Sequence, residues 1–120
     1  MGYLTTHVLD TANGLPAVGM RYRLYQLDGP DAALRTLLVE GLTNQDGRTP
    51  APLLEGAEFI KCHYELLFDV AAYFSVLGMA LAAPSFLDVV VLRFGISDIS
   101  AHYHVPLLVS PWSYSTYRGS

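Results

Sequence analysis

Residues 59–78, FIKCHYELLFDVAAYFSVLG, carry the clearest structural pattern in the chain. Over residues 59–70 the side chains alternate, as in a half-buried β-strand with period two. One face of this predicted strand consists of Ile60, Cys62, Tyr64, Leu66, Phe68 and Val70. Residues 71–78 then change to an apolar spacing of three and four, which predicts a helix of two to three turns with Asp69 as its N-cap. A long strand followed by one short helix therefore indicates a mainly β protein.

Further strands are expected on both sides of this segment. Residues 3–9, 19–27 and 34–42 are predicted strands, with turns at Asn13-Gly14, Leu15-Pro16 and residues 28–31, and residues 43–52 are a predicted loop. Residues 86–96 are apolar on both faces, which favours a central strand. Residues 102–110 and 112–118, divided by Pro111, complete the set. Seven or eight short strands and one helix predict an antiparallel β-sandwich.

The composition favours one domain that associates with copies of itself. The chain has 120 residues, a usual size for a single domain over residues 1–120. It is 52% hydrophobic and only 15% charged, against a usual charged share of roughly 25%. We therefore expect a homo-oligomer that buries apolar surface between subunits. The net charge of −4, with Lys61 and six arginines as the only cations, argues against nucleic-acid binding.

Cellular location and redox chemistry are constrained by two further features. The longest apolar run, residues 70–83, is shorter than the about 20 residues of a membrane-spanning helix. No secretory signal opens the chain, so we expect a cytoplasmic protein without a membrane partner. The single cysteine, Cys62, excludes an internal disulfide and is expected to be a buried structural thiol.

The histidines are the first candidates for chemistry. His102 and His104 form an H-x-H pair, which a strand places on one side. With a third ligand such as His7 the pair could hold zinc, but H-x-H alone is a weak signal. We therefore predict neither a metal nor a cofactor. His63 is expected at the surface or in an interface, and His7, judged from its local pattern alone, is expected to be structural.

The other candidates also have ordinary interpretations. Arg48 lies on a predicted loop and would usually be solvated, Tyr117 would usually be a packing residue, and Ser120 is the last residue. The chain contains no serine nucleophile elbow, phosphate-binding loop or pair of catalytic carboxylates. Spacing alone thus predicts only a small β-sandwich with a candidate site of imidazoles and an arginine.

Three blocks of sequence carry a resemblance that goes further. Residues 4–16, LTTHVLDTANGLP, and residues 43–49, TNQDGRT, resemble the opening signature and the central arginine motif of the 5-hydroxyisourate hydrolases, which are transthyretin-related enzymes of urate breakdown. Residues 103–111, YHVPLLVSP, and 114–120, YSTYRGS, resemble the closing signature. The blocks follow the order of that family and extend over nearly the whole chain. The terminal Tyr-Arg-Gly-Ser separates these hydrolases from the hormone-carrying transthyretins, which share the fold.

The resemblance implies a fold, an assembly and a set of site residues. The implied fold is a transthyretin-like antiparallel β-sandwich of two four-stranded sheets with one short α-helix. The implied assembly is a homotetramer with sites at the dimer–dimer interface. The implied catalytic residues are His7, Arg48, His104 and Ser120, and the implied substrate-binding residues are His7, Arg48 and Tyr117. Residues 78–84, which are unusually apolar, and residues 50–52, Pro-Ala-Pro, depart from the usual pattern.

The implied reaction is hydrolysis of 5-hydroxyisourate to 2-oxo-4-hydroxy-4-carboxy-5-ureidoimidazoline, by attack of water on a ring carbonyl without a metal. We expect His104 to be the base, oriented by Ser120, and Arg48 to hold the carbonyl. His7 would bind the substrate and relay a proton, and Tyr117 would pack on the heterocycle. Two alternatives remain: a non-catalytic carrier of an aromatic small molecule, and a structural β-domain that only oligomerises.

Overall fold

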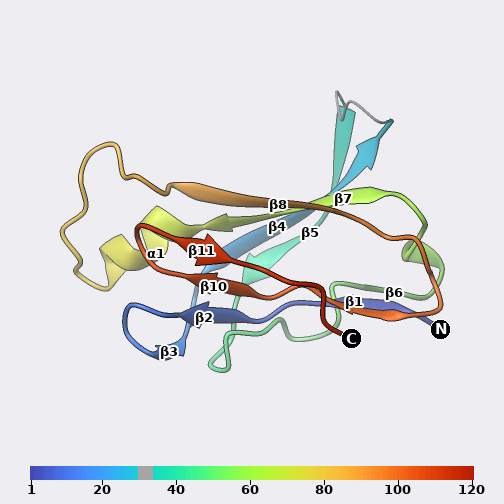
Figure 1. Cartoon of the computed structure of the whole chain (residues 1–120), viewed down its shortest axis with the longest axis horizontal. Coiled ribbons are helices and arrows are strands. Elements are labelled where there is room, and N and C mark those ends of the chain that lie inside the picture. Colours follow the sequence, from blue (N-terminus) through green and yellow to red (C-terminus); the bar gives the residue numbers. More distant parts are fainter. Residues whose placement is uncertain (30–33) are drawn as a thin grey trace.

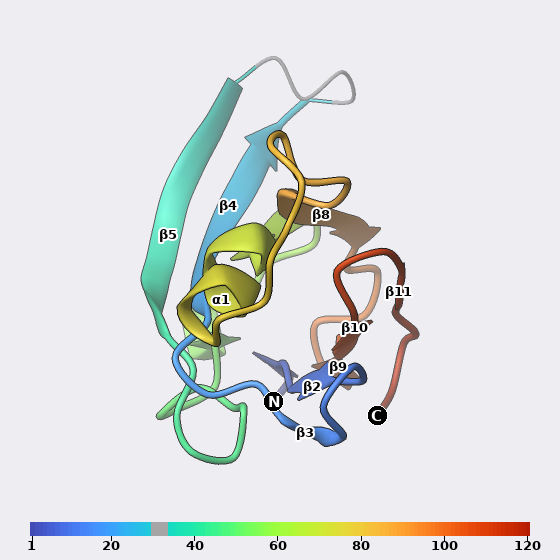
Figure 2. The same ribbon diagram turned by 90° about the vertical axis from the view of Figure 1, so that its left-hand side faces the viewer.

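The computed structural model describes residues 1–29 and 34–120, and within them the chain forms two β-layers with one helix at an end (Figures 1 and 2). Pro30 and Asp31 of the predicted turn lie outside the described residues. The strands are β1 (Tyr3–Thr5), β2 (Val8–Asp10), β3 (Leu15–Pro16), β4 (Arg21–Asp28), β5 (Leu34–Leu42), β6 (Leu54–Glu55), β7 (His63–Asp69), β8 (Val89–Gly95), β9 (His102–His104), β10 (Leu107–Val109) and β11 (Tyr114–Ser115). Helix α1 is Val70–Val76, and a 3-10 turn covers Gly56–Glu58.

The first layer is an antiparallel sheet in the order β5-β4-β7-β8. Its inner face follows the predicted alternation: Tyr64, Leu66 and Phe68 of β7 are fully buried. Strand β5 has the predicted bounds, and β4 begins and ends close to them. Local side-chain pattern therefore predicted where the four strands of this layer lie, because each of them is seven residues or longer.

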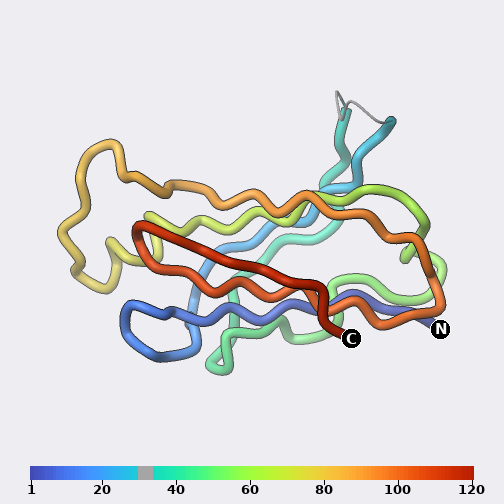
Figure 3. The backbone as a smooth tube through the Cα atoms, in the orientation of Figure 1, coloured from blue at the N-terminus to red at the C-terminus, as the bar shows by residue number. Residues whose placement is uncertain are grey.

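The second layer contains two interrupted strands that lie beside each other (Figure 3). Its sheets have the orders β6-β1-β9 and β11-β10-β2-β3, in which β1 leads into β2 and β9 into β10. The expected strands 3–9 and 102–110 are thus each divided in two. Pro106, at the second break, has no backbone N–H to give to a ladder. The pairs β1–β9 and β2–β10 are parallel, so the expected sandwich is confirmed but its pairing is not wholly antiparallel.

Three further predictions about individual strands were wrong, two on their extent and one on their place in the sheet. Residues 59–62 are not part of β7, because the Tyr64 hydroxyl bonds both the N–H and the carbonyl of Ile60 and closes a local turn. Strand β8 is at an edge of its sheet in the single chain rather than central, and it leaves Val89 39% and Val91 43% exposed. The expected strand 112–118 shortens to β11.

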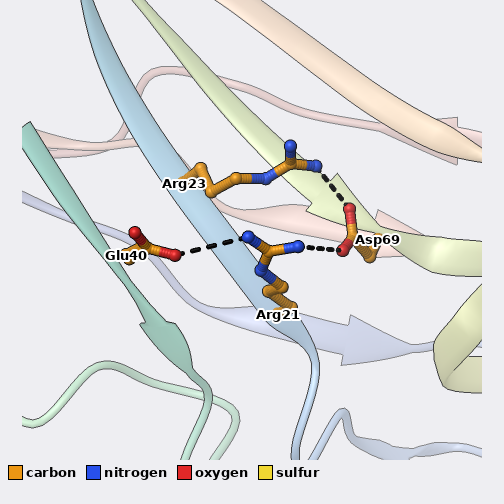
Figure 4. A network of polar contacts seen from close by, with 4 residues as sticks. All are labelled: Arg21, Arg23, Glu40 and Asp69. Carbon is orange, nitrogen blue, oxygen red and sulfur yellow. Dashed lines mark hydrogen bonds and ion pairs between the residues drawn. The ribbon is translucent and has the colours of Figure 1, made fainter. Parts of the chain in front are cut away.

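The helix begins and ends near its predicted limits, but Asp69 does not cap it. Asp69 occupies the N-cap position without a side-chain hydrogen bond to the helix. Its carboxylate instead pairs with Arg21 and Arg23 of β4, and Arg21 also reaches Glu40 of β5 (Figure 4). The two guanidinium groups compete for the carboxylate with the helix N–H groups, and the ion pairs tie the end of β7 to β4 and β5.

Helix α1 closes one end of the sandwich, where Val70, Tyr73 and Phe74 are buried (Figure 2). The Tyr73 hydroxyl donates a hydrogen bond of 2.8 Å to the buried carboxylate of Asp10, which also accepts two bonds from Asn13. The Asp-Thr-Ala-Asn segment thereby anchors the helix to β2. Within residues 1–29 and 34–120, no helix has the length and apolar character needed to cross a bilayer.

Candidate active site

The breaks in the two neighbouring strands of the second layer coincide. Thr5 pairs with His104 at the end of β1 and β9, and Val8 pairs with Leu107 where β2 and β10 begin. Between these positions the Val105 N–H donates to the Thr5 carbonyl and the Leu107 N–H to the His7 carbonyl, both at 2.9 Å. The two histidines of the predicted catalytic set therefore lie at one interruption of the sheet, which we name the seam (residues 5–8 and 104–107).

His104 is held at the seam by contacts on both sides. Its Nδ1 is 2.8 Å from the Thr5 hydroxyl. Its backbone is paired with Gly119: the Gly119 N–H donates to the His104 carbonyl at 2.7 Å, and the His104 N–H donates to the Gly119 carbonyl at 3.1 Å. The side chain is half-buried. Ser120 follows Gly119 in the closing segment (residues 112–120), so this pairing holds the last residue near His104.

Arg48 is presented by a tight loop that is attached to the seam. The Asn44 N–H donates to the Arg48 carbonyl at 2.9 Å, and the Asn44 side-chain oxygen accepts the Arg48 N–H at 3.0 Å. Gly47, with a φ of +72°, accepts the Val8 N–H at its carbonyl at 2.8 Å. Arg48 itself forms an isolated bridge with His7. The predicted loop is therefore confirmed, and it fixes Arg48 beside the first strand.

The tautomer of His7 follows from its hydrogen bond. Its Nε2 is 2.8 Å from the Asp46 carbonyl oxygen, which can only accept. Nε2 must therefore carry a proton, and in the neutral imidazole Nδ1 carries the lone pair. His7 is half-buried. Its Nε2 has the structural role that the local pattern predicted, whereas its Nδ1 takes no part in this contact.

The surroundings of His104 lower its pKa below the ordinary value of 6.5. Burial is the largest cause, since it disfavours the charged imidazolium. The positive charge of Arg48 is next, followed by charge on His102 and His7. His104 is consequently a neutral imidazole near pH 7, the form that can accept a proton.

The closing segment places the remaining predicted residues differently. Tyr117 lines a groove of about 410 Å³ between β8 and residues 114–118, whereas Arg48 lines a separate depression with Thr5 and residues 49–52. Arg118 lies over the Tyr103 ring, 4.3 Å from its centroid, and so fastens the segment to β9. Ser120 is exposed. The closing segment is docked at Gly119, but its aromatic residues Trp112, Tyr114 and Tyr117 remain exposed in the single chain.

Two residues at or beside the seam, Thr5 and His102, were not in the predicted catalytic set. Thr5 bonds His104, and the same hydroxyl is 2.7 Å from Nε2 of His102. The His-x-His spacing places His102 and His104 on one strand face, whereas the approach of Thr5 depends on the pairing of β1 with β9. Among the described residues, no three His, Cys, Asp or Glu side chains are grouped so as to hold a metal ion. Burial raises the pKa of the Cys62 thiol, which is partly buried against the core.

Comparison with known proteins identifies the family. The model of the HIUase/Transthyretin family matches residues 4–119. The chain belongs to this family. Among its relatives, 5-hydroxyisourate hydrolase 2 of Rhizobium meliloti is 56% identical over 99% of this chain and 97% of its own length. The 5-hydroxyisourate hydrolase of Deinococcus radiodurans is 56% identical over 98% of this chain and 95% of its own.

Solved structures of the family share the fold. The crystal structure of (S)-allantoin synthase has a TM-score of 0.92 and 50% identity; it covers 99% of this chain, which spans 44% of that protein. Klebsiella pneumoniae 5-hydroxyisourate hydrolase has a TM-score of 0.80 and 30% identity over the full length of both chains. Sea bream transthyretin in complex with thyroxine has a TM-score of 0.84 and 27% identity, covering 97% of this chain and 93% of its own. The predicted family and fold are therefore confirmed.

Proposed function

We propose that the protein hydrolyses 5-hydroxyisourate to 2-oxo-4-hydroxy-4-carboxy-5-ureidoimidazoline, in the degradation of urate. Two relatives named 5-hydroxyisourate hydrolase are 56% identical to it over nearly its whole length. The structural observation that carries the proposal is His104, a half-buried imidazole with a lowered pKa, held by Thr5 beside the cationic Arg48. That pairing of a neutral base with a fixed cation suits attack of water on a carbonyl.

In the first step His104 acts as general base. A water oxygen bonds to the ring carbonyl carbon, and the water proton passes to Nε2 of His104, because Nδ1 is engaged with Thr5. The carbonyl π electrons move to oxygen and form a tetrahedral oxyanion. Burial and, after it, the charge of Arg48 hold the pKa of His104 low, so the base is ready at neutral pH and its imidazolium gives the proton up readily.

Arg48 stabilises the oxyanion. Its guanidinium is always charged and offers a planar fork of N–H donors, which can hold a carbonyl oxygen in the ground state and bind it more tightly as charge develops. The backbone of the Arg48 loop is closed by Asn44 and fixed to Val8. A preorganised loop of this kind positions the charge without reorganisation during the reaction.

His7 binds the substrate and serves the leaving nitrogen. Its Nε2–H is committed to the Asp46 carbonyl, so the neutral ring presents Nδ1 as an acceptor for a ring N–H of the substrate. Collapse of the oxyanion breaks the C–N bond, and the nitrogen takes a proton from the His104 imidazolium, directly or by way of His7. The acyl carbon leaves as the carboxylate of the product, and no metal takes part.

The closing segment completes the proposed site. Gly119 is paired with the backbone of His104, so the hydroxyl of Ser120 is available to orient His104 and the attacking water. Tyr117 packs on the planar heterocycle. Because Tyr117 and Arg48 line different depressions in one chain, a substrate that contacts both calls for a second subunit.

The assembly we propose is a homotetramer of single-domain chains with sites at the dimer–dimer interface, acting in the cytoplasm on a small molecule. Exposed apolar side chains support association: Val89, Val91, Trp112, Tyr114 and Tyr117. Val89 and Val91 lie on β8, the three aromatic residues lie in the closing segment, and Trp112 is 64% exposed. Aromatic residues of this kind are enriched in the centres of protein interfaces.

A carrier of an aromatic small molecule is the second candidate, since sea bream transthyretin, which binds thyroxine, shares 27% identity and the fold. The decay of freshly generated 5-hydroxyisourate, followed by ultraviolet absorbance with and without the protein, separates the two. A hydrolase accelerates the decay at catalytic concentration. A carrier would slow it or consume no more than one equivalent per site, and a chelator that abolished the acceleration would point to a metal site instead.

A further inference from the structure

The Thr5 hydroxyl joins two imidazoles. It lies 2.7 Å from Nε2 of His102 and 2.8 Å from Nδ1 of His104. The parallel pairing of β1 with β9 creates this geometry, because Thr5 is opposite His104 and His102 is two residues earlier on the same face. The two rings are 6.2 Å apart between centroids. Thr5 therefore stands between them as a single shared partner.

His102 is itself fixed in place. Its ring stacks on Tyr3 with 4.0 Å between centroids and 9° between planes. Its carbonyl accepts a hydrogen bond of 3.5 Å from Arg118. A side chain held by stacking, by a neighbouring strand and by the Thr5 hydroxyl keeps its Nε2 aimed at that hydroxyl, and the contact is thus a property of the fold rather than of a mobile surface residue.

Counting protons restricts the states of this triad. A hydroxyl donates one hydrogen and accepts up to two. In the described part of the chain the two imidazoles are the only hydrogen-bond partners of the Thr5 hydroxyl, so its hydrogen points to one of them. With both rings neutral, that imidazole accepts from Thr5 and the other donates to it. If His104 carries its proton on Nδ1, then Thr5 donates to His102 and leaves His102 protonated on Nδ1. If His102 carries its proton on Nε2, then Thr5 donates to His104 and leaves His104 protonated on Nε2. The two rings therefore share the same tautomer.

We propose that Thr5 is a positioning residue that couples the tautomers of His102 and His104, and that His102 is the proton reservoir of the site. The catalytic part rests on the proposed function. With both rings in the Nδ1–H form, His104 offers the lone pair of Nε2 to water. With both in the Nε2–H form, His104 offers a proton to the leaving nitrogen.

One turnover can switch His104 between its Nδ1–H and Nε2–H forms, with His102 holding the extra proton in between. Water gives a proton to Nε2 of His104, the Nδ1 proton of His104 moves to the Thr5 oxygen, and the original Thr5 proton moves to Nε2 of His102. The positive charge now lies on His102, and His104 is neutral with an Nε2 proton for the leaving nitrogen. As the Nε2 proton passes to the leaving nitrogen, the reverse shift through Thr5 returns a proton to Nδ1 of His104 in the same step, so that no imidazolate anion forms and the starting state is restored.

The charges that face the triad favour this transfer. Arg48 and His7 both act on His104 and disfavour its imidazolium, as does charge on His102. Moving the charge from His104 to His102 takes it off the ring on which Arg48 acts. On the side of His102, the guanidinium of Arg118 bonds the His102 carbonyl, and the Tyr3 ring stacks on the imidazole.

Nuclear magnetic resonance of the ring nitrogens tests the coupling without any substrate. At a pH where both rings are neutral, the 15N shifts of His102 and His104 in the wild-type protein should report the same tautomer, Nδ1–H in both. One ring in each tautomer would overturn the coupling. Nε2–H in both would uphold the coupling but contradict the proposed role of His104 as resting base, so the two hypotheses fail separately.

Kinetics of two variants test the catalytic part. Thr5→Val keeps the shape and removes the hydroxyl, and we expect kcat to fall about tenfold or more with KM within about twofold, as for the loss of one orienting hydrogen bond. Thr5→Ser keeps the hydroxyl and should recover most of kcat. His102→Phe retains an aromatic ring for Tyr3 and should lower kcat as Thr5→Val does. If Thr5→Ser were as impaired as Thr5→Val, or if His102→Phe matched the wild type, the proton reservoir would be wrong.

A neighbouring threonine provides the control for structural damage. The Thr6 hydroxyl is buried and donates to the Val105 carbonyl at 2.7 Å, without contact to either imidazole. Thr6→Val should lower the midpoint of chemical denaturation but leave the shared tautomer of the two histidines in place. An equal change of tautomer in Thr6→Val and Thr5→Val would assign the effect to general loosening of the seam and overturn the proposal.

Discussion

Replacing Gly47 by alanine tests how the Arg48 loop is seated on the sheet. Gly47 has a φ of +72°, and a Cβ there would lie well inside van der Waals distance of the Val8 carbonyl oxygen, 3.2 Å from the Ala17 nitrogen and 3.3 Å from the Pro16 Cβ. The two nearest atoms, the Val8 oxygen and the Ala17 nitrogen, belong to the backbone. The added carbon can therefore fit only if the loop moves away from β2. That movement would break the bond from the Val8 N–H to the Gly47 carbonyl.

The cost can be estimated by parts. The left-handed backbone costs a non-glycine residue about 1 kcal/mol. Overpacking against backbone adds about 1–3 kcal/mol, and the weakened hydrogen bond adds about 1 kcal/mol. We therefore expect Gly47→Ala to lower the free energy of unfolding by about 3–5 kcal/mol. Because Arg48 is the next residue, kcat/KM for 5-hydroxyisourate should also fall by at least about tenfold.

Gly14 is a matched control. Its φ is +69°, nearly the same as that of Gly47, but a Cβ there would have no atom within 4 Å. Gly14→Ala should therefore lose only the backbone share, about 1 kcal/mol, and keep its activity. Urea denaturation of the two variants and the wild type gives the comparison. Losses that agree within about 0.5 kcal/mol would show that the loop does not press on β2, and the reasoning would fail.

Three further outcomes follow from the site and its supports. Tyr73→Phe removes a buried hydroxyl that donates to Asp10, and thermal or urea denaturation should show a loss of about 1–3 kcal/mol; an unchanged midpoint would mean that the bond does not anchor the helix. The pKa of His104 is lowered, so the acidic limb of kcat/KM, which reports protonation of the base, should lie below pH 6.5. Arg48→Gln removes a cation that disfavours the imidazolium and should move that limb to higher pH. A limb that stayed in place would contradict the electrostatic assignment. Deletion of Ser120 keeps the backbone pairing of Gly119 with His104 and should preserve the melting temperature while lowering kcat about tenfold or more; full activity in the truncated protein would remove Ser120 from the site.

Local pattern in the sequence predicted where the strands of the layer β5-β4-β7-β8 lie, because these strands are long. Leu66 and Phe68 are fully buried as their parity requires, and α1 ends next to Gly78, which has a φ of +87°. Asp69 takes the predicted N-cap position but makes no capping hydrogen bond, for a reason that lies outside the local sequence. Asp69 meets Arg23 only because β4 pairs with β7. The two residues are far apart in the sequence, so the residues around Asp69 give no sign of this contact.

The second layer shows the same limit. The interruption of the strand 3–9 depends on the Val8 N–H, which donates to Gly47 some forty residues later. Thr5 becomes a partner of His104 only through the parallel register of β1 and β9. The spacing of His102 and His104 predicted one shared face, and this is confirmed because both rings bond the same hydroxyl. The roles of His7, Arg48, His104 and Ser120 stay predictions, which rest on resemblance and on the geometry of the seam.

The most direct measurement compares wild type with His104→Ala in the decay of 5-hydroxyisourate. Both proteins are assayed at the same folded concentration, checked by circular dichroism, against spontaneous decay in buffer. Wild type should accelerate the decay at catalytic concentration, and His104→Ala should lose about a hundredfold or more of that acceleration, as expected when a general base is removed. An equal rate for the two proteins, or no acceleration by wild type, would contradict the account.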